Sequence, residues 1–187
     1  MNDEIRQKSN RKNTAARSAK ECAYLAVFVA LVIAAQLALT LVPGVEVVTV
    51  LFVAYSFTFG WKRGMAAATA FSLLRQVVFG VYPVVLIVYL VYYNALALTF
   101  GLLGKKMRVE IKTLWKVALI ACYCTICFTM IDNILTPIWY GYSEKAARLY
   151  FYASLPFMIP QVVCTAITVA TLFLPLKQAF VFVKKGL

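Results

Sequence analysis

Arg75 is the residue of this sequence best suited to bind a charged or polar ligand. It interrupts the apolar stretch AAATAFSLLRQVVFGVYPVV, residues 66–85. A guanidinium keeps its charge at physiological pH, so burying it requires anionic or hydrogen-bonding partners. The acidic residues expected at the same level are Glu46 and Asp132. One interpretation is a polar binding pocket, and the other is an arginine whose long side chain reaches the lipid headgroups.

Tyrosines follow Arg75 in the chain. Tyr82, Tyr89 and Tyr93 are spaced by seven and four residues, which places them on one stripe of a helix. Tyr82 also suits the membrane interface. The hydroxyls of Tyr89 and Tyr93 need partners, which either a ligand or another helix would supply. These three residues are therefore candidates for substrate binding.

A second group of candidates lies in DNILTPIWYGYSEKAARLYFY, residues 132–152, which we expect to form an outer polar and aromatic loop. Loops of this kind collect binding residues. Asp132, Asn133 and Trp139 are its candidate site residues, although Trp139 also fits an aromatic belt at the membrane surface.

The composition requires a membrane setting for these residues. Hydrophobic residues make up 63% of the chain and charged residues only 14%, against about 25% charged residues in soluble domains. A membrane helix needs roughly 17 to 25 apolar residues, and Pro and Gly interruptions mark the turns between them. The sequence predicts an all-α bundle of six transmembrane helices, over residues 22–42, 45–60, 64–80, 84–103, 115–135 and 149–174.

Lysine and arginine predict the orientation, because cytoplasmic loops carry the excess of positive charge. Residues 1–20 carry six of these cations and residues 104–116 carry five. Between the fifth and sixth predicted helices there are only Lys145 and Arg148. Both termini are thus expected in the cytoplasm, with Arg75 toward the outer surface of the membrane.

The N-terminal residues 1–20 are polar and basic without apolar periodicity. Such a segment buries too little surface to fold, so we expect a flexible cytoplasmic tail followed by a membrane domain over residues 21–187. Attraction to anionic lipid headgroups accounts for its charge. A nucleic-acid role is not expected.

Known enzyme chemistries find little support. The chain contains no histidine, which excludes histidine-based triads and zinc sites built on histidine. Cys124 and Cys127 have the spacing of a metal-binding or redox pair, but no second pair accompanies them, and small apolar packing residues are the simpler interpretation. No glycine-rich phosphate loop is present. We expect a protein that is not an enzyme and has no cofactor, metal or ATPase of its own.

Alanines form a ladder in the first predicted helix. Ala26, Ala30 and Ala34 recur every four residues, and small residues at this spacing let two helices approach closely. The ladder predicts either a docking face for a partner protein or a contact within the chain.

These features together resemble the S component, the substrate-binding membrane subunit, of an energy-coupling factor (ECF) transporter. Six helices in under two hundred residues, a basic tail and the alanine ladder look like that family. The segment LVPGVEVVTVLFVAYSFTFGWKRG, residues 41–64, is also similar to a stretch found in some S components. It differs from the commonest pattern at Gly44, where asparagine is more usual.

The resemblance implies a high-affinity binder of a vitamin or related micronutrient. It also implies docking through the first helix onto a transmembrane T component, which two cytoplasmic ATPases drive. A small secondary transporter or channel subunit is the alternative, and a purely structural subunit is a third possibility. Against an ion path, the third, fourth and fifth predicted helices offer no second deep acidic residue.

Overall fold

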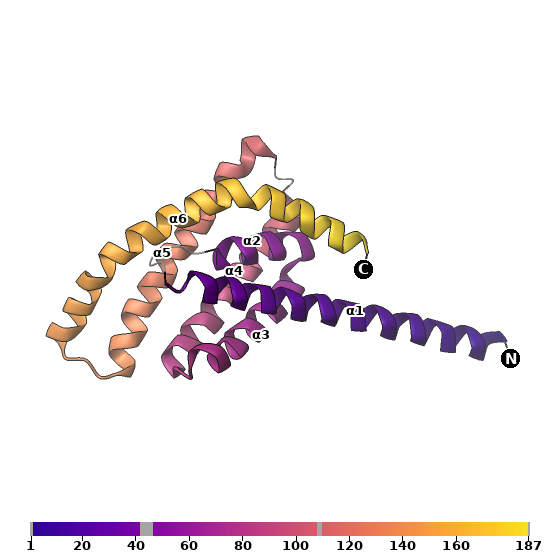
Figure 1. Ribbon diagram of the computed structural model, residues 1–187, viewed down its shortest axis with the longest axis horizontal. Coiled ribbons are helices and arrows are strands. Elements are labelled where there is room, and N and C mark those ends of the chain that lie inside the picture. The colour runs from indigo at the N-terminus through magenta and orange to yellow at the C-terminus, as the bar shows by residue number, and fades with distance from the viewer. Residues whose placement is uncertain (1, 42–46, 108–109, 187) are drawn as a thin grey trace.

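The computed structural model describes residues 2–41, 47–107 and 110–186, with side chains described from residue 18 onward except at residue 112. These residues form six α-helices and one short 3-10 helix (Figure 1), which confirms the predicted all-α fold. The helices are α1 (Asn2–Leu39), α2 (Val48–Phe59), α3 (Trp61–Phe79), α4 (Pro83–Lys106), η1 (Ile111–Thr113), α5 (Leu114–Trp139) and α6 (Glu144–Lys185).

Four helices are long and apolar enough to cross a membrane: α1 from Ser18 onward, α4, α5 and α6. They indicate a multi-pass membrane protein. Of the remaining two, α2 has only 12 residues, about 18 Å of helix at 1.5 Å per residue. The other, α3, carries three cations, Lys62, Arg63 and Arg75. The prediction of six membrane crossings therefore depends on α2 and α3, and it stays a prediction.

Helix α2 forms the centre of the bundle. Its residues from Val48 to Thr58 are all buried, as expected for a short helix that is apolar on every side. It packs mainly against α4 and α6. Glycines allow α4 to come close: a Cβ atom on Gly101 would overlap the backbone nitrogen of Trp61, and one on Gly104 would overlap the Phe57 carbonyl oxygen.

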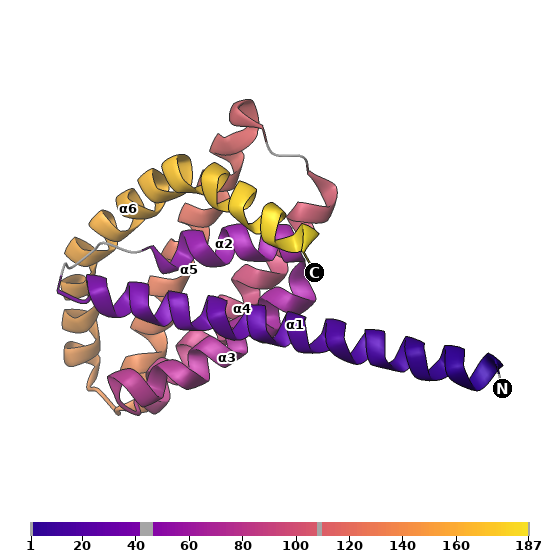
Figure 2. The same ribbon diagram turned by 45° about the vertical axis from the view of Figure 1, so that its right-hand side comes forward.

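Helix α1 begins at Asn2, so residues 2–20 continue the first membrane helix where the sequence predicted an unfolded tail. This part of α1 projects away from the other helices in both views (Figures 1 and 2). A helix that continues outward from a packed segment needs no separate nucleation, because each added residue gains one backbone hydrogen bond.

The prediction of an outer loop over residues 132–152 is wrong. Helix α5 continues to Trp139 and α6 begins at Glu144, leaving a short turn at residues 140–143. Gly141 supplies the positive φ of 63° that this turn requires. The Ser143 hydroxyl then caps α6 by accepting a hydrogen bond from the Ala146 N–H.

The expected end of the last helix before Pro175 is also wrong, because α6 runs through that residue to Lys185. Its interior contains three prolines, Pro156, Pro160 and Pro175, and α6 follows a curved path over the bundle (Figure 1). Proline bends a helix by removing a backbone hydrogen bond. Membrane helices tolerate this where neighbouring groups satisfy the freed carbonyls.

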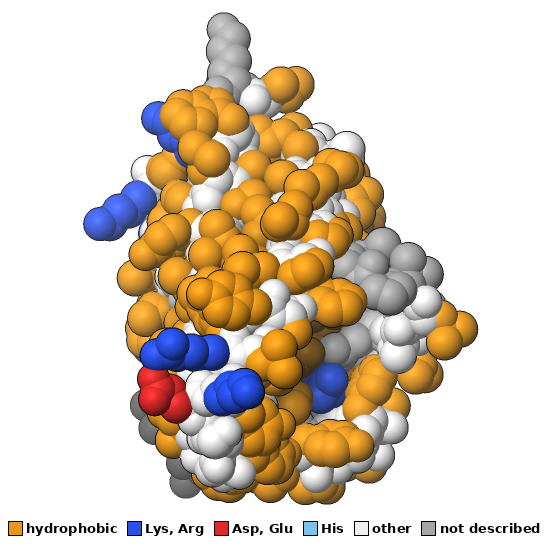
Figure 3. Space-filling model, turned by 90° about the vertical axis from the view of Figure 1, so that its left-hand side faces the viewer, with side chains coloured by type: hydrophobic (Ala, Val, Ile, Leu, Met, Phe, Trp, Pro, Cys, Tyr) orange, Lys and Arg blue, Asp and Glu red, His pale blue; other side chains and the backbone are white. Residues whose placement is uncertain are grey.

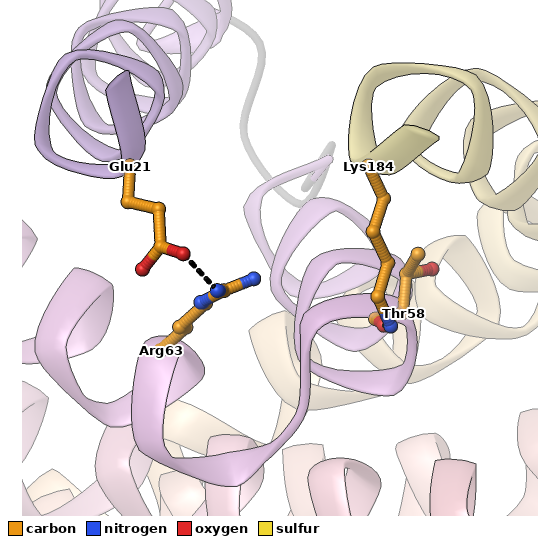
Figure 4. A network of polar contacts seen from close by, with 4 residues as sticks. All are labelled: Glu21, Thr58, Arg63 and Lys184. Carbon is orange, nitrogen blue, oxygen red and sulfur yellow. Dashed lines mark hydrogen bonds and ion pairs between the residues drawn. The ribbon is translucent and has the colours of Figure 1, made fainter. Parts of the chain in front are cut away.

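Two contacts tie the helices together where α2 turns into α3. Arg63 forms a 2.5 Å ion pair with Glu21 of α1, and the Lys184 ammonium of α6 donates a 2.6 Å hydrogen bond to the Thr58 carbonyl (Figure 4). The Thr58 carbonyl lies in the last turn of α2, where carbonyls lack partners within the helix. We call this region, defined by these four residues, the Arg63 end.

Candidate functional site

Arg75 lies one turn before the end of α3 and is held by side chains from two neighbouring helices. Its Nε donates a 3.2 Å hydrogen bond to Oε1 of Gln36 on α1. Its guanidinium carbon lies 4.3 Å from the centre of the Tyr89 ring on α4 and 4.8 Å from that of Phe79. Gln36 in turn donates a 3.1 Å hydrogen bond to the Tyr89 hydroxyl. Gln36, Arg75, Phe79 and Tyr89 together form what we call the Arg75 cluster.

Arg75 keeps one donor unused in this cluster. Its Nη1 atom is buried and has no hydrogen-bond partner among the described residues. The Nε2 atom of the adjacent Gln76 is in the same state, while its Oε1 accepts a 3.0 Å hydrogen bond from the Tyr82 N–H. A buried donor without a partner costs about 1–3 kcal/mol. These two donors are therefore available to an acceptor supplied from outside the described chain.

No described acidic residue pairs with Arg75. Asp132 lies on α5 and accepts hydrogen bonds from two hydroxyls, Thr136 at 2.9 Å and Tyr150 at 3.0 Å. The proposed pairing of Arg75 with Asp132 is wrong for this structure. Glu46 lies outside the described residues. The Arg75 side chain contacts Gln36 of α1 and Tyr89 of α4.

The tyrosine stripe of α4 divides into three environments. Tyr89 belongs to the Arg75 cluster. Tyr93 is only 1% exposed and contacts Phe52 and Phe71, with ring centres 4.8 and 5.1 Å apart, so it belongs to the core. Tyr82 is 53% exposed at the N-terminus of α4. The structure does not bring Tyr82 into contact with the Arg75 cluster, and its exposure fits the interfacial interpretation.

A pocket of about 350 Å³ lies between α5 and α6. It is lined by Phe128, Thr129, Asp132, Tyr150, Ala153, Ser154, Phe157, Met158 and Gln161. Asn133 reaches its wall, because its side-chain amide donates a 2.7 Å hydrogen bond to the Ser154 hydroxyl. Asn133 is itself 6% exposed, and its buried Oδ1 has no partner among the described residues.

The pocket and the Arg75 cluster are neighbours through Phe128. The Phe128 ring lines the pocket, and its centre lies 5.8 Å from that of Tyr89. Tyr89 is the residue on whose ring Arg75 stacks. The candidate site therefore has two parts, a cationic part on α1, α3 and α4 and an acidic part on α5 and α6, with the Tyr89 and Phe128 rings between them.

The remaining predicted residues lie apart from both parts. Trp139 is 54% exposed at the end of α5. Ala26, Ala30 and Ala34 are exposed on α1, whose opposite side buries Phe28, Val29 and Val32. No described helix covers the alanine ladder.

Sequence reasoning missed several residues of the site, among them Gln36, Gln76, Phe79, Phe128, Tyr150 and Ser154. Gln36 had a usable signal, since it is an isolated polar residue in an apolar helix. Phe79 also had one, since it lies four residues after Arg75 on the same helix, where side chains are neighbours. Tyr150 and Ser154 carry no such signal, because aromatic and small hydroxyl residues are ordinary in membrane helices.

Hydrophobic side chains dominate the surface on the side of α5 and α6, and a group of charged side chains lies near the lower edge of that view (Figure 3). Among the described residues, no group of three His, Cys, Asp or Glu side chains is placed to hold a metal ion.

No family model, curated protein or solved structure matches this chain.

Proposed function

We propose that this chain is a membrane-embedded binding subunit that captures a small solute through Arg75. The observation that carries the proposal is the buried Nη1 atom of Arg75, which has no described partner although its neighbours hold the guanidinium firmly. A fixed guanidinium with an unused donor suits a carboxylate, phosphate or carbonyl group. The cluster is formed by side chains from three helices, so it is positioned before a ligand arrives, which lowers the cost of binding.

The proposed role is that of an S component of an ECF-type importer in a bacterial plasma membrane. The basic residues favour a six-span arrangement with cytoplasmic termini, which puts the Arg75 cluster near the outer surface. The solute, a vitamin or related micronutrient, would pass inward through a T component driven by two ATPases. The exposed ladder of Ala26, Ala30 and Ala34 supports docking on that component, because small residues let a partner helix approach closely.

The test is the amount of solute that the purified protein retains. Small molecules released by denaturation are measured by mass spectrometry for the parent, Arg75→Leu and Arg75→Lys. Removing a hydrogen bond to a charged group costs about 1.5–3 kcal/mol, so Arg75→Leu should bind about 10- to 150-fold more weakly. Arg75→Lys should recover part of this loss, because an ammonium keeps the charge but not the planar fork.

Arg148→Leu is the matched control. Arg148 is an exposed arginine that pairs with Glu144 at 2.5 Å on α6, and exposed pairs contribute little. Its variant should retain as much solute as the parent. Equal retention by Arg75→Leu, with an unchanged melting temperature, would remove Arg75 from the binding site.

A further inference from the structure

Asp132 is a carboxylate on a membrane-spanning helix without a cationic partner in the described chain. Other carboxylates of the described chain have cationic partners: Glu21 pairs with Arg63, and Glu144 pairs with Arg148. Asp132 receives hydrogen bonds only from the neutral hydroxyls of Thr136 and Tyr150. These hydroxyls stabilise the charged carboxylate but do not neutralise it. Ionised groups inside membrane proteins usually pair with another charge or mark a ligand path.

The surroundings of Asp132 favour a cation. Asp132 lines the pocket of about 350 Å³ between α5 and α6 together with Phe128 and Phe157, and this volume lies within the usual range for ligand sites. Aromatic faces attract cations through the negative charge above the ring. A carboxylate also accepts up to about four hydrogen bonds, so the two that Asp132 receives leave acceptor capacity. No lysine or arginine lines this pocket.

We propose that the α5–α6 pocket binds a cationic group of the solute, an organic ammonium or a positively charged ring, with Asp132 as its counter-ion. This inference rests on the proposed function and names the chemical class of the ligand. Arg75 holds the anionic or carbonyl end, and Asp132 holds the cationic end. Tyr89 and Phe128, whose ring centres are 5.8 Å apart, lie between the two ends. The solute is therefore amphoteric.

The test measures the charge preference of the pocket directly, with two thiol reagents of opposite charge. Ala153 lines the pocket and makes no side-chain hydrogen bond, so Ala153→Cys changes it little. The variant is treated with a trimethylammonium-bearing and a sulfonate-bearing methanethiosulfonate. Peptide mass spectrometry assigns the label, so the native cysteines stay in place. Val81→Cys, at a position 75% exposed beside α4, gives the reference ratio of the two rates.

The expected result is a ratio of cationic to anionic reagent rates at Ala153→Cys at least about tenfold above that at Val81→Cys, because a charge in a cleft focuses its field. Adding Asp132→Asn should return the ratio to the reference value. An unchanged ratio in the Asp132→Asn background would overturn the proposal, as would equal ratios at the two positions. Absence of labelling at Ala153→Cys by either reagent would also overturn it, because a solute could not reach the pocket from water.

This outcome is independent of the test of Arg75. A cation preference that depends on Asp132, together with normal solute retention by Arg75→Leu, would keep the acidic subsite and reject the proposed role of Arg75. Loss of retention in Arg75→Leu without a cation preference would leave a binding subunit whose solute has no cationic group.

Discussion

At the Arg63 end of the bundle, the charged side chains of Glu21, Arg63 and Lys184 find partners within the chain, whereas near Arg75 several polar side chains have buried atoms without a described partner. Arg63 pairs with Glu21, and Lys184 bonds the Thr58 carbonyl. Close by, the rings of Phe28 and Tyr55 stack with their centres 3.9 Å apart. Around the candidate site, three side chains each have a buried polar atom without a described partner. They are Arg75, Gln76 and Asn133.

The difference separates two uses of polar groups in an apolar protein. Buried polar groups are almost always satisfied, so unsatisfied ones call for an explanation. Ser56 is a fourth case, in the last turn of α2 close to the Arg63 end, where its hydroxyl lies against Gly64 of α3. Close helix packing explains Ser56. Arg75, Gln76 and Asn133 lie beside the candidate site, and an external partner explains them better.

The largest change in stability is expected where helices touch through their backbones. Gly101→Ala would force a Cβ atom against the Trp61 backbone nitrogen, and overpacking costs about 1–3 kcal/mol, more than the roughly 1 kcal/mol that alanine gains in helix propensity. We expect a clearly lower melting temperature in detergent. Leu102→Ala, at a neighbour 42% exposed, should leave it nearly unchanged. A Gly101→Ala protein as stable as the parent would contradict the close approach of α4.

A smaller loss is expected at Lys184. Lys184→Met removes the charged donor from the Thr58 carbonyl in the last turn of α2, and we expect a loss of about 1 kcal/mol in the free energy of unfolding. Lys185→Met is the control, because no hydrogen bond or ion pair of Lys185 is found in the described chain, and its change should stay within about 0.5 kcal/mol. Solute retention should be unaffected by either. Equal stability of the two variants would show that Lys184 does not cap α2.

The smallest change in stability is expected on the alanine ladder. Ala30 is exposed, so Ala30→Leu should change the free energy of unfolding by less than about 0.5 kcal/mol and leave solute binding intact. If the ladder docks onto a T component, the added volume should abolish uptake by the assembled transporter. Normal uptake would remove this face from the docking surface. A large loss of stability in the isolated subunit would show that the ladder packs within the chain.

Apolar runs between Pro and Gly interruptions predicted most of the fold. They placed the starts of α4 and α5 within a residue of the observed ones. They failed where a helix continues through an interruption: Pro175 did not end α6, and the polar residues from Asp132 to Trp139 belong to α5 and not to a loop. In a membrane, backbone groups must be satisfied internally, so helices persist through polar residues and prolines that would favour loops in water.

The candidate site was predicted less well than the fold. Arg75 was found because a permanent cation in an apolar run is rare. Its partner Gln36 was not, because the face that α1 presents to α3 depends on packing that an almost uniformly apolar sequence does not specify. Phe79 lies four residues after Arg75 on the same helix, a spacing at which two side chains are neighbours. Asp132 was predicted as a site residue, but the partner predicted for it was wrong. Its contact with Tyr150 forms because α6 begins after a turn of only four residues, which the sequence analysis did not predict.

The shortness of α2 has a consequence for how the protein enters the membrane. Its 12 residues reach about 18 Å, well short of the roughly 30 Å hydrocarbon layer, and its buried surface is enclosed by other helices. Such a segment is too short to be inserted by itself. Gly60, with φ of 90°, is the single residue between α2 and α3, so we expect the two helices to enter the bilayer together. We therefore expect α2 to reach its final position only after α4 and α6 are present, because these two helices supply most of its contacts.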